Sequence, residues 1–288
     1  MSVAIVTDST AYLPVDLVAS QGIRVVPLHV VLGGRQFSEG VDVTTAEVAA
    51  ALRTFTAVST SRPSPQQFLE AYEEAAAGGA DAVVSVHISA DMSGTAESAR
   101  LAADLSPITV EVVDSRSIGM AMGYAVLSAA EAAREGQDAK TVAAVARSRA
   151  KAATVIFYVD TLEHLRRGGR IGAASALLGS ALAIKPLLAM ADGHIKPIEK
   201  VRTAARALSR LEELALRAAE AAGEAGVDIA VHHLDSPTRA SDLVDRLRAK
   251  VPSRASVVLL ELGAVVGAHV GPGTIAVAVS PRPRAGQD

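Results

Sequence analysis

The chain has 288 residues, of which 50% are hydrophobic and 20% charged, and its mean hydropathy is +0.30, so it is long enough to bury the cores of two domains. A net charge of −3 and an aromatic content of 3% supply neither the positive field nor the stacking surfaces of nucleic-acid-binding proteins, and we expect no nucleic-acid partner. The absence of cysteine excludes disulfides, thiolate nucleophiles and cysteine-ligated metals and is typical of a cytoplasmic protein.

Neither of the apolar stretches that could meet a membrane fits a targeting or spanning segment. Val3–Thr7 is followed at once by Asp8 and no basic segment precedes it, so it predicts a buried strand rather than a signal peptide. The longest apolar stretch, Ile171–Ile184, contains two glycines and is shorter than the roughly 20 residues of a membrane-spanning helix. It predicts a helix of small residues, packed either in the interior or beside an apolar ligand. We expect no stable membrane insertion.

Short β-type segments alternate with alanine-rich helical segments in the first half of the chain. The expected strands are Val3–Thr7, Val25–Val31, Ala82–His87 and Thr109–Val113. The expected helices are Pro14–Ser20, Thr45–Thr54, Pro65–Gly78, Thr95–Asp104, Ile118–Gly136 and Asp138–Ala150. Strands that alternate with helices predict an α/β fold with a mainly parallel sheet, covered by helices on both faces.

A change in composition near residue 150 marks the expected domain boundary. We expect an N-terminal α/β domain over residues 1–152, a C-terminal α/β domain over 153–281, and a flexible tail over 282–288. In the second domain, Asp192-Gly193 is a typical hairpin turn between two strand-like segments. The other expected elements are strands at Asp228–His232, Ser256–Glu261 and Thr274–Val279, and helices at Thr203–Ala222 and Ser236–Ala249. Before the hairpin come the segments Val155–Asp160 and Leu162–Arg167 and a turn at Gly168-Gly169-Arg170.

Three segments rich in hydroxyls, glycine or histidine lie at the ends of strand-like stretches. They are Ser59–Ser64, Asp91–Thr95 and Gly267–Gly273. In open α/β sheets, ligands bind beyond the carboxyl ends of the strands, where loops and helix N-termini gather. Hydroxyls, backbone N–H groups and one imidazole can hold an anion such as a carboxylate without a full positive charge beside it.

At these segments and at several others, over nearly its whole length, the chain resembles the DegV family of fatty-acid-binding proteins. The matching motifs are Val6-Thr7-Asp8-Ser9-Thr10, Leu13-Pro14, Pro27-Leu28, Thr60-Ser61 with Pro63-Ser64, Ser93-Gly94-Thr95, Asp114-Ser115, Gly168-Gly169-Arg170-Ile171, Ile184-Lys185-Pro186-Leu187-Leu188, Asp192-Gly193, Lys200-Val201-Arg202-Thr203 and Gly267-Ala268-His269-Val270-Gly271-Pro272-Gly273. The specificity of the match comes from their order and spacing together, because each motif alone is common.

The resemblance implies a two-domain α/β protein that binds one long-chain fatty acid between its domains and has no catalytic residues of its own. It implies that a separate fatty acid kinase makes the acyl phosphate for phospholipid metabolism and supplies ATP and metal. The chain itself is then expected to need no metal or cofactor, which agrees with its lack of a P-loop motif.

The resemblance also implies which residues do this. The fatty acid carboxylate is expected on Thr60 and Ser93, with Ser61 and Gly94 beside them and His269 close to the head group. Arg202 is expected beside the head group or on the surface that faces the kinase, and Arg170 is a second candidate for that surface. Two positions depart from the family pattern: Arg62 stands where glutamine is common, which adds charge near the head group, and Ile118 stands where methionine is common.

Elementary energetics favour a tunnel over a shallow groove. Charge-assisted hydrogen bonds contribute about 1.5–3 kcal/mol each, so the hydroxyl groups can anchor the head group but hardly drive binding. About fourteen buried methylenes gain on the order of 11 kcal/mol before ordering costs. We expect the tail to point inward and the head group to lie near the surface.

Two other functions remain open from the residues alone. Ser93, His269 and either Asp91 or Asp114 could form a serine hydrolase triad, although Ser93 lacks the Gly-X-Ser-X-Gly elbow. A phosphotransfer protein of similar fold would carry phosphate on a histidine near a strand end. The candidates for that histidine are His87 and His29.

Structural roles also remain open for several candidate residues. Ser93 and Ser64 could cap helices, and Thr60 could be a plain turn residue. Asp8 and Asp114 could either orient the hydroxyl segments or cap neighbouring backbone. His232, His233 and Asp235 are close in sequence, but adjacent side chains on a strand point to opposite faces, so we expect no metal site there.

Overall fold

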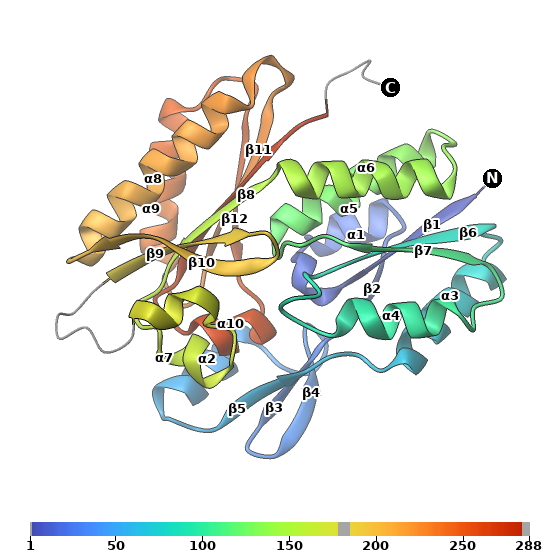
Figure 1. Cartoon of the computed structure of the whole chain (residues 1–288), viewed down its shortest axis with the longest axis horizontal. Coiled ribbons are helices and arrows are strands. Elements are labelled where there is room, and N and C mark those ends of the chain that lie inside the picture. The colour runs from blue at the N-terminus through green and yellow to red at the C-terminus, as the bar shows by residue number, and fades with distance from the viewer. Residues whose placement is uncertain (1, 178–184, 284–288) are drawn as a thin grey trace.

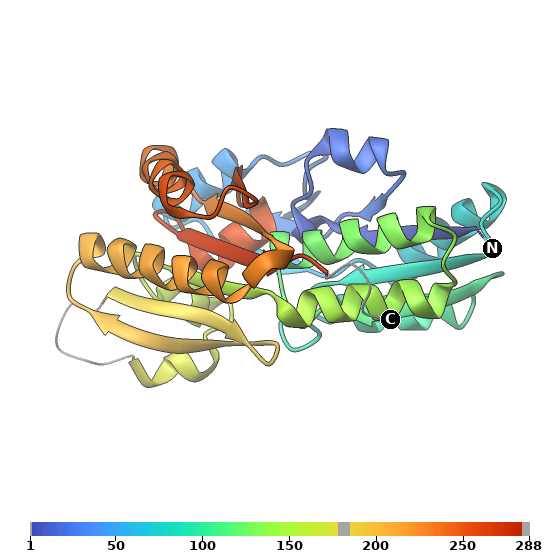
Figure 2. The same ribbon diagram turned by 90° about the horizontal axis from the view of Figure 1, so that it is seen from above.

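The computed structural model describes residues 2–177 and 185–283, and within them two sheets lie side by side along the longest axis of the molecule (Figure 1). A four-stranded parallel sheet is formed by the first half of the chain and a six-stranded mixed sheet by the second half. The perpendicular view shows the same two halves next to each other, with the gold strands at one end and the cyan strands at the other (Figure 2). The expected α/β architecture with a parallel first sheet is thereby confirmed.

The parallel sheet has the strand order β2-β1-β6-β7. Its strands are Val3–Asp8 (β1), Arg24–Val26 (β2), Ala82–His87 (β6) and Thr109–Asp114 (β7). Because side chains alternate along a strand, Ile5 and Val84 pack against α5 and α6, whereas Val6 and Val83 pack against α3 and α4. The helices of this half are Val15–Ser20 (α1), Pro65–Ala77 (α3), Thr95–Ala103 (α4), Met120–Arg134 (α5) and Ala139–Ala152 (α6), and a 3-10 turn lies at Ser9–Ala11 (η1).

A small antiparallel sheet of order β4-β3-β5 is also formed by the first half. Its strands are His29–Leu32 (β3), Arg35–Ser38 (β4) and Val58–Ser61 (β5), and the helix Thr45–Arg53 (α2) lies between β4 and β5 in the chain. The single strand predicted over Val25–Val31 is wrong, because β2 and β3 belong to different sheets. Pro27 has no N–H to donate, and the N–H of Leu28 donates to Ser9 Oγ at 3.0 Å instead of to a strand.

The mixed sheet has the order β10-β9-β8-β13-β11-β12, in which β11 and β12 are parallel and the other pairs antiparallel. Its strands are Thr154–Tyr158 (β8), Lys185–Ala191 (β9), His194–Val201 (β10), Val227–His233 (β11), Ser256–Glu261 (β12) and Ile275–Pro281 (β13). On one face Ile156 and Val277 pack under the helices Ala204–Ala221 (α8) and Pro237–Lys250 (α9). On the other face Val155, Phe157 and Ala276 line a cavity between the halves.

The short elements of the second half include a helix that the sequence did not predict. They are Glu163–Arg167 (α7), Gly172–Leu177 (η2, a 3-10 helix), Gly223–Ala225 (η3) and Ala264–Val270 (α10). The segment Gly267–Gly273 was expected at the end of a strand-like stretch, but its first four residues are the C-terminal part of α10. Alanine, valine and glycine of α10 are buried on nearly all sides, so the amphipathic period that usually reveals a helix is missing.

Three further expectations concern the second half. The hairpin of β9 and β10 with Asp192-Gly193 at its turn is confirmed. The expected small-residue helix over Ile171–Ile184 is a 3-10 helix in its first part, and residues 178–184 lie outside the described part of the chain. The expected loose tail begins with Arg282, which forms an ion pair with Asp228 at 2.6 Å, and residues 284–288 are also outside the described part.

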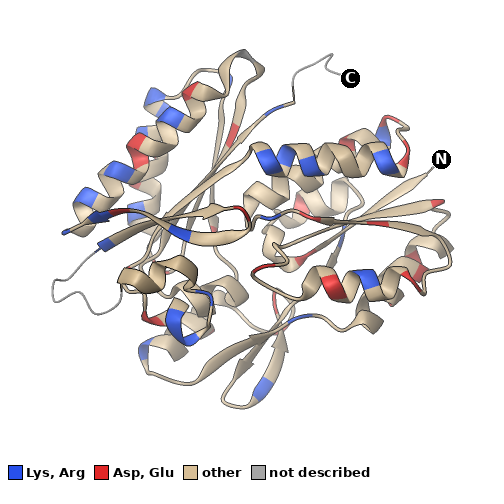
Figure 3. Cartoon of the chain, in the orientation of Figure 1, with Lys and Arg blue, Asp and Glu red and all other residues tan. Residues whose placement is uncertain are grey.

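Basic and acidic side chains are interspersed over both halves of the molecule (Figure 3). Among residues 2–177 and 185–283, no helix has both the length and the apolar character needed to cross a bilayer.

Candidate functional site

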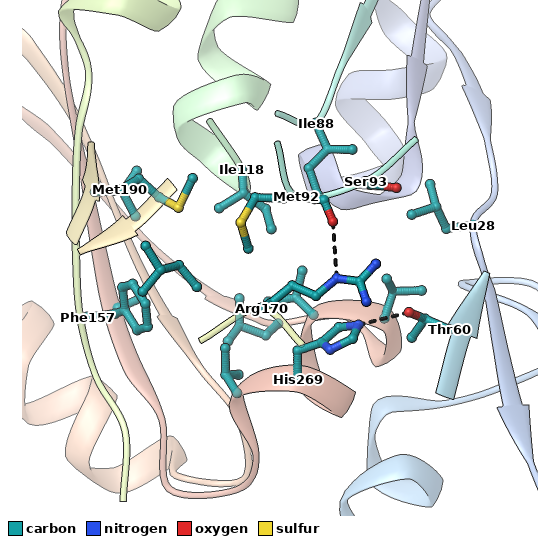
Figure 4. A pocket seen from close by; sticks show the side chains of 18 of the residues that line it. Leu28, Thr60, Ile88, Met92, Ser93, Ile118, Phe157, Arg170, Met190 and His269 are labelled. Carbon is teal, nitrogen blue, oxygen red and sulfur yellow. Dashed lines mark hydrogen bonds between the residues drawn. The ribbon is translucent and has the colours of Figure 1, made fainter. Parts of the chain in front are cut away.

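A cavity of about 290 Å³ lies between the parallel-sheet half and the mixed-sheet half. Figure 4 shows that it receives side chains from both halves, with aliphatic groups and sulfur on one side and hydroxyl, guanidinium and imidazole groups on the other. This volume is close to the lower end of the about 300–1,000 Å³ that is typical of small-molecule sites.

The polar end of the cavity is built from strand ends and the loops that follow them. Thr60 lies near the end of β5, and Ser93 and Gly94 lie between β6 and α4, where the carboxyl end of a parallel strand meets a helix N-terminus. Thr60 Oγ1 is 2.8 Å from Nε2 of His269, and Ser93 Oγ is 2.8 Å from Oγ1 of Thr95. The three predicted segments therefore meet at one end of a single cavity, together with Ser61.

His269 is held in place by α10 and by Gly168, whose lack of a side chain leaves room for the imidazole. A Cβ on Gly168 would overlap with Nδ1 of His269, and this nitrogen is buried without a hydrogen-bond partner in the described structure. Burial, with a smaller effect of the Arg170 guanidinium, lowers the pKa of His269 to about 4. The imidazole is therefore neutral at neutral pH and is suited to relaying a hydrogen bond rather than to pairing with an anion.

Two arginines lie at the polar end and differ in their partners. Arg170 donates from Nε to the carbonyl of Met92 at 3.2 Å and from Nη1 to the carbonyl of Gly168 at 2.6 Å, so main-chain oxygens orient a guanidinium that lines the cavity. Arg62 forms an ion pair with Glu97 at 2.7 Å and donates to the carbonyl of Gly94. The extra charge expected from Arg62 is therefore largely matched by a carboxylate.

The apolar wall comes mainly from the mixed sheet and from the loops that follow β6 and β7. Its members are Leu28, Ile88, Met92, Ile118, Val155, Phe157, Leu165, Met190, Ile195, Leu262, Val265, Val266, Val270, Ala276 and Ala278. Methionine and the β-branched residues leave a surface of CH₂ and CH₃ groups with no obligatory polar partner. Such a wall suits an aliphatic chain.

His232 is the polar exception on the mixed-sheet side of the cavity. It is 3% exposed and accepts a hydrogen bond from the N–H of Met120 at 3.3 Å. Burial lowers the pKa of His232 to about 4, so this ring is also uncharged at neutral pH. Within the described ranges 2–177 and 185–283, no three His, Asp or Glu side chains are grouped so that they could hold a metal ion.

The structure gathers most, but not all, of the predicted site residues. Thr60, Ser61, Ser93, Gly94 and His269 line the cavity together. Arg170, expected on an outer surface, lines it as well. Arg202 is exposed just before α8 and is not among the residues that line the cavity.

Some residues of the cavity carried no recognisable signal in the sequence. Tyr12 lines it from a left-handed backbone position at the end of η1. Met190 of β9 and Ile195 of β10 are paired across the hairpin and line the cavity from the same face. The alternation of side chains in that hairpin could have identified the inward face, but only if the location of the first half had been known.

The geometry argues against a serine hydrolase. Ser93 Oγ is hydrogen-bonded to Thr95, and Nε2 of His269 is engaged with Thr60 rather than with Ser93. Nδ1 of His269, which a triad carboxylate would orient, has no partner in the described structure. Asp114 instead accepts hydrogen bonds from the main-chain N–H groups of Ala90 and Arg116.

The histidines proposed for phosphotransfer are not placed for it. His87 is fully buried between Asp8 at 3.0 Å and Ser85 at 2.7 Å, so a phosphoryl donor cannot reach it. His29 is 6% exposed and its Nε2 lies 3.2 Å from Oε1 of Gln67. Asp8 also accepts from the main chain of Thr10, which confirms its capping role.

Comparisons with known proteins agree with the fold. The DegV family of uncharacterised proteins matches residues 2–282. A DegV domain-containing protein of Streptomyces coelicolor is 54% identical over 280 residues, which cover 97% of this chain and 99% of that protein. The crystal structure of DegV from Bacillus subtilis, described as a fatty acid binding protein, is 31% identical with a TM-score of 0.89 over 98% of this chain and 100% of that one.

A second solved structure is similar over the same extent. A DegV family protein from Thermus thermophilus, whose structure is described in terms of fatty acid binding, is 36% identical with a TM-score of 0.90, over 98% of this chain and 100% of that one. The family match over residues 2–282 and the 54% identity to the Streptomyces protein leave no alternative assignment. The chain belongs to the DegV family.

Proposed function

We propose that the chain binds one long-chain fatty acid, with the carboxylate at the polar end of the cavity and the aliphatic tail along its apolar wall. The observation that carries this proposal is the meeting of Thr60, Ser93 and His269 at one end of a cavity whose remaining wall is mainly apolar. The fatty acid binding described for the Thermus and Bacillus relatives supports the same ligand class.

A simple hydrogen-bond relay explains how neutral groups hold the carboxylate. If the proton of the neutral His269 ring is on Nε2, the ring donates to Oγ1 of Thr60, and the unpartnered Nδ1 is left only with a lone pair. The hydroxyl proton of Thr60 is then free to point at the ligand, as is that of Ser93. Arg170 lies close enough to the same end to add a positive charge to a carboxylate or a larger anion.

We further infer that the chain does not phosphorylate its ligand but presents it to a separate fatty acid kinase. The head-group end is formed by exposed or half-buried loops, so a second protein can approach the carboxyl group there while the tail stays covered. Arg202, which is exposed and outside the cavity, fits a role in docking the kinase. We also propose that the two halves are two domains, with the boundary between residues 152 and 153.

Mass spectrometry of an organic extract from the purified, denatured protein tests the first part of the proposal. We expect about one equivalent of a long-chain fatty acid. Each buried methylene stabilises the complex by about 0.8 kcal/mol, so the ligand should remain bound through purification. The double variant Thr60→Val/Ser93→Ala should retain much less, and Ser64→Ala, which alters a neighbouring hydroxyl outside the cavity lining, should retain as much as the wild type. Equal retention in all three proteins would refute the placement of the carboxylate.

The division of labour with a kinase is tested separately. Labelled ATP and the loaded protein alone should give no acyl phosphate, whereas addition of the kinase should give it. Arg202→Glu should reduce product formation at limiting kinase concentration and leave the content of bound fatty acid unchanged. Formation of acyl phosphate by the chain alone would overturn the proposal.

A further inference from the structure

Glu39 is a buried carboxylate that neither the cavity nor the family motifs account for. It follows β4 and is 6% exposed. One carboxylate oxygen accepts a hydrogen bond from the hydroxyl of Ser9 at 2.5 Å, and the other accepts from the N–H of Val265 at 2.7 Å. Because Ser9 belongs to the first half and Val265 to α10, Glu39 joins the two halves through one carboxyl group.

Tyr12 makes a second connection beside the first. Its phenol oxygen accepts a hydrogen bond from the N–H of Val266 at 3.3 Å, the next donor of the same helical turn. A Cβ on Gly263, the residue before α10, would overlap with Oε1 of Glu39 and with the ring of Tyr12. The start of α10 is therefore pressed against two side chains of the first half, at a distance that only glycine allows.

The helix held in this way forms part of the wall of the cavity. Val265, Val266, His269 and Val270 of α10 all line it, and His269 bonds to the head-group residue Thr60. α10 also packs on a cluster of buried residues from β3, α2 and the segments just before them. These are Leu28, Val30, Val43 and Val48. A ligand cannot gain space on this side of the cavity unless α10 moves away from Glu39.

We propose that Glu39 is a positioning residue for the bound fatty acid: by fixing the first turn of α10 to the first half, it holds His269 and Val266 around the ligand and slows ligand release. This inference rests on the fatty acid binding proposed above. It differs from it in that Glu39 is not among the residues that line the cavity and so acts only through α10.

The charge environment of Glu39 gives the proposal a signature in pH. Burial raises the pKa of its carboxyl group from 4.5 to about 7, the donors Ser9, Val265 and Tyr12 oppose that rise, and the nearby Asp8 adds to it. On the adjoining strand β3, His29 faces Gln67 and Ser38. The carboxyl group of Glu39 binds its proton more tightly while α10 is in contact with it than when α10 has moved away. As the pH rises from 4.5 through about 7, the state in which α10 has moved away is therefore favoured more and more.

The test is the rate at which bound cis-parinaric acid, a fluorescent long-chain fatty acid, is displaced by excess unlabelled fatty acid. Glu39→Gln replaces one of two accepting oxygens with an NH₂ group, which cannot accept, whereas the O–H oxygen of a protonated Glu39 still can. The variant therefore loses a hydrogen bond in a buried site at any pH, and release should become about tenfold faster or more. Tyr12→Phe, which removes the second connection, should also speed up release. For the wild type the rate should rise with pH up to about pH 7 and then level off, and for Glu39→Gln this rise should disappear.

Two controls separate positioning from general loosening of the fold. Glu73→Gln removes a carboxylate from the exposed face of α3 and should release parinaric acid at the wild-type rate. Ser64→Ala lowers stability by removing the cap of α3 and should leave both the rate and its pH dependence unchanged.

The possible outcomes decide the proposal. Wild-type release from both Glu39→Gln and Tyr12→Phe would overturn it, as would an unaltered pH profile in Glu39→Gln. If Glu39→Gln does not fold, Tyr12→Phe carries the rate test alone. A wild-type protein that takes up no parinaric acid at any pH would instead refute the proposed function, so the two failures are distinguishable.

Discussion

Single side chains at the polar end of the cavity depend on neighbours that have no side chain at all. The carbonyl of Gly168 accepts from Arg170, and its missing Cβ leaves the space that Nδ1 of His269 occupies. One residue of the motif Gly168-Gly169-Arg170 thus serves two cavity residues. The close approach of backbone and imidazole, and not a need for unusual dihedral angles, explains the glycine, since φ of Gly168 is −74°.

Gly168→Ala should therefore damage ligand binding without straining the backbone. The new methyl group displaces the imidazole of His269 and breaks its hydrogen bond to Thr60, and we expect the Kd for a long-chain fatty acid to rise about tenfold. Gly78→Ala is a matched control, because Gly78 also ends a helix, with φ −76°, and its Cβ would meet only the last turn of that helix. Titration with parinaric acid measures both, and an unchanged Kd for Gly168→Ala would exclude His269 from the site.

At the scale of elements, two serines near the N-termini of helices have different roles. Ser64 caps α3 in a capping box with Gln67, which confirms the capping role considered for it. The N-cap residue of α4 is Gly94, and it makes no side-chain cap, while Ser93 bonds to Thr95 and lines the cavity. The capping explanation therefore does not hold for Ser93.

This contrast predicts that stability and binding separate between the two serines. Ser64→Ala should lower the free energy of unfolding by about 1 kcal/mol with little change in Kd. Ser93→Ala should lower it by less, within about 0.5 kcal/mol, but raise the Kd for fatty acid. Urea unfolding of the ligand-free proteins and parinaric acid titration give the two quantities, and an equal loss of stability in both variants would contradict this assignment.

Elements with a regular pattern could be predicted from the sequence, and those shaped by contacts between the halves could not. Strands β6 and β12 begin and end at the residues predicted from their apolar and β-branched segments, and Asp192-Gly193 forms the predicted hairpin turn. α10 has no polar face, because both the cavity and the small sheet cover it. The three polar segments could be recognised from their composition, but the roles of Arg170 and Glu39 arise only when distant segments meet.

For the whole molecule, polar contacts between the halves surround the cavity but do not fill it. Ser89 donates to the carbonyl of Gly193 at 2.8 Å, and Thr45 donates to the carbonyl of Leu262 at 3.0 Å. Between these contacts the apolar walls of the two halves face each other across the cavity, whose volume is about 290 Å³. A ligand that touches both walls stabilises the closed arrangement of the two halves and shifts unfolding to higher temperature by mass action.

The same buried groups set how the stability of the ligand-free molecule depends on pH. His232 and His269 have their pKa values lowered from 6.5 to about 4, so the unfolded chain binds protons that the folded chain excludes. Stability is therefore present above pH 6.5 and is lost as the pH falls toward 4. On acidification from about pH 7.5 to about pH 5, each histidine should lower the free energy of unfolding by about 2 kcal/mol.

Glu39 has the opposite effect on stability over a similar pH range. Its pKa is raised from 4.5 to about 7, so the folded chain binds the extra proton and gains stability on acidification, by about the same amount as one histidine loses. Urea unfolding at the two pH values should show a smaller acid loss for His232→Gln than for the wild type, and a larger one for Glu39→Gln. If Glu39→Gln showed a smaller loss instead, its carboxyl group would have to be ionised throughout, and the pH dependence of ligand release argued from it would fail as well.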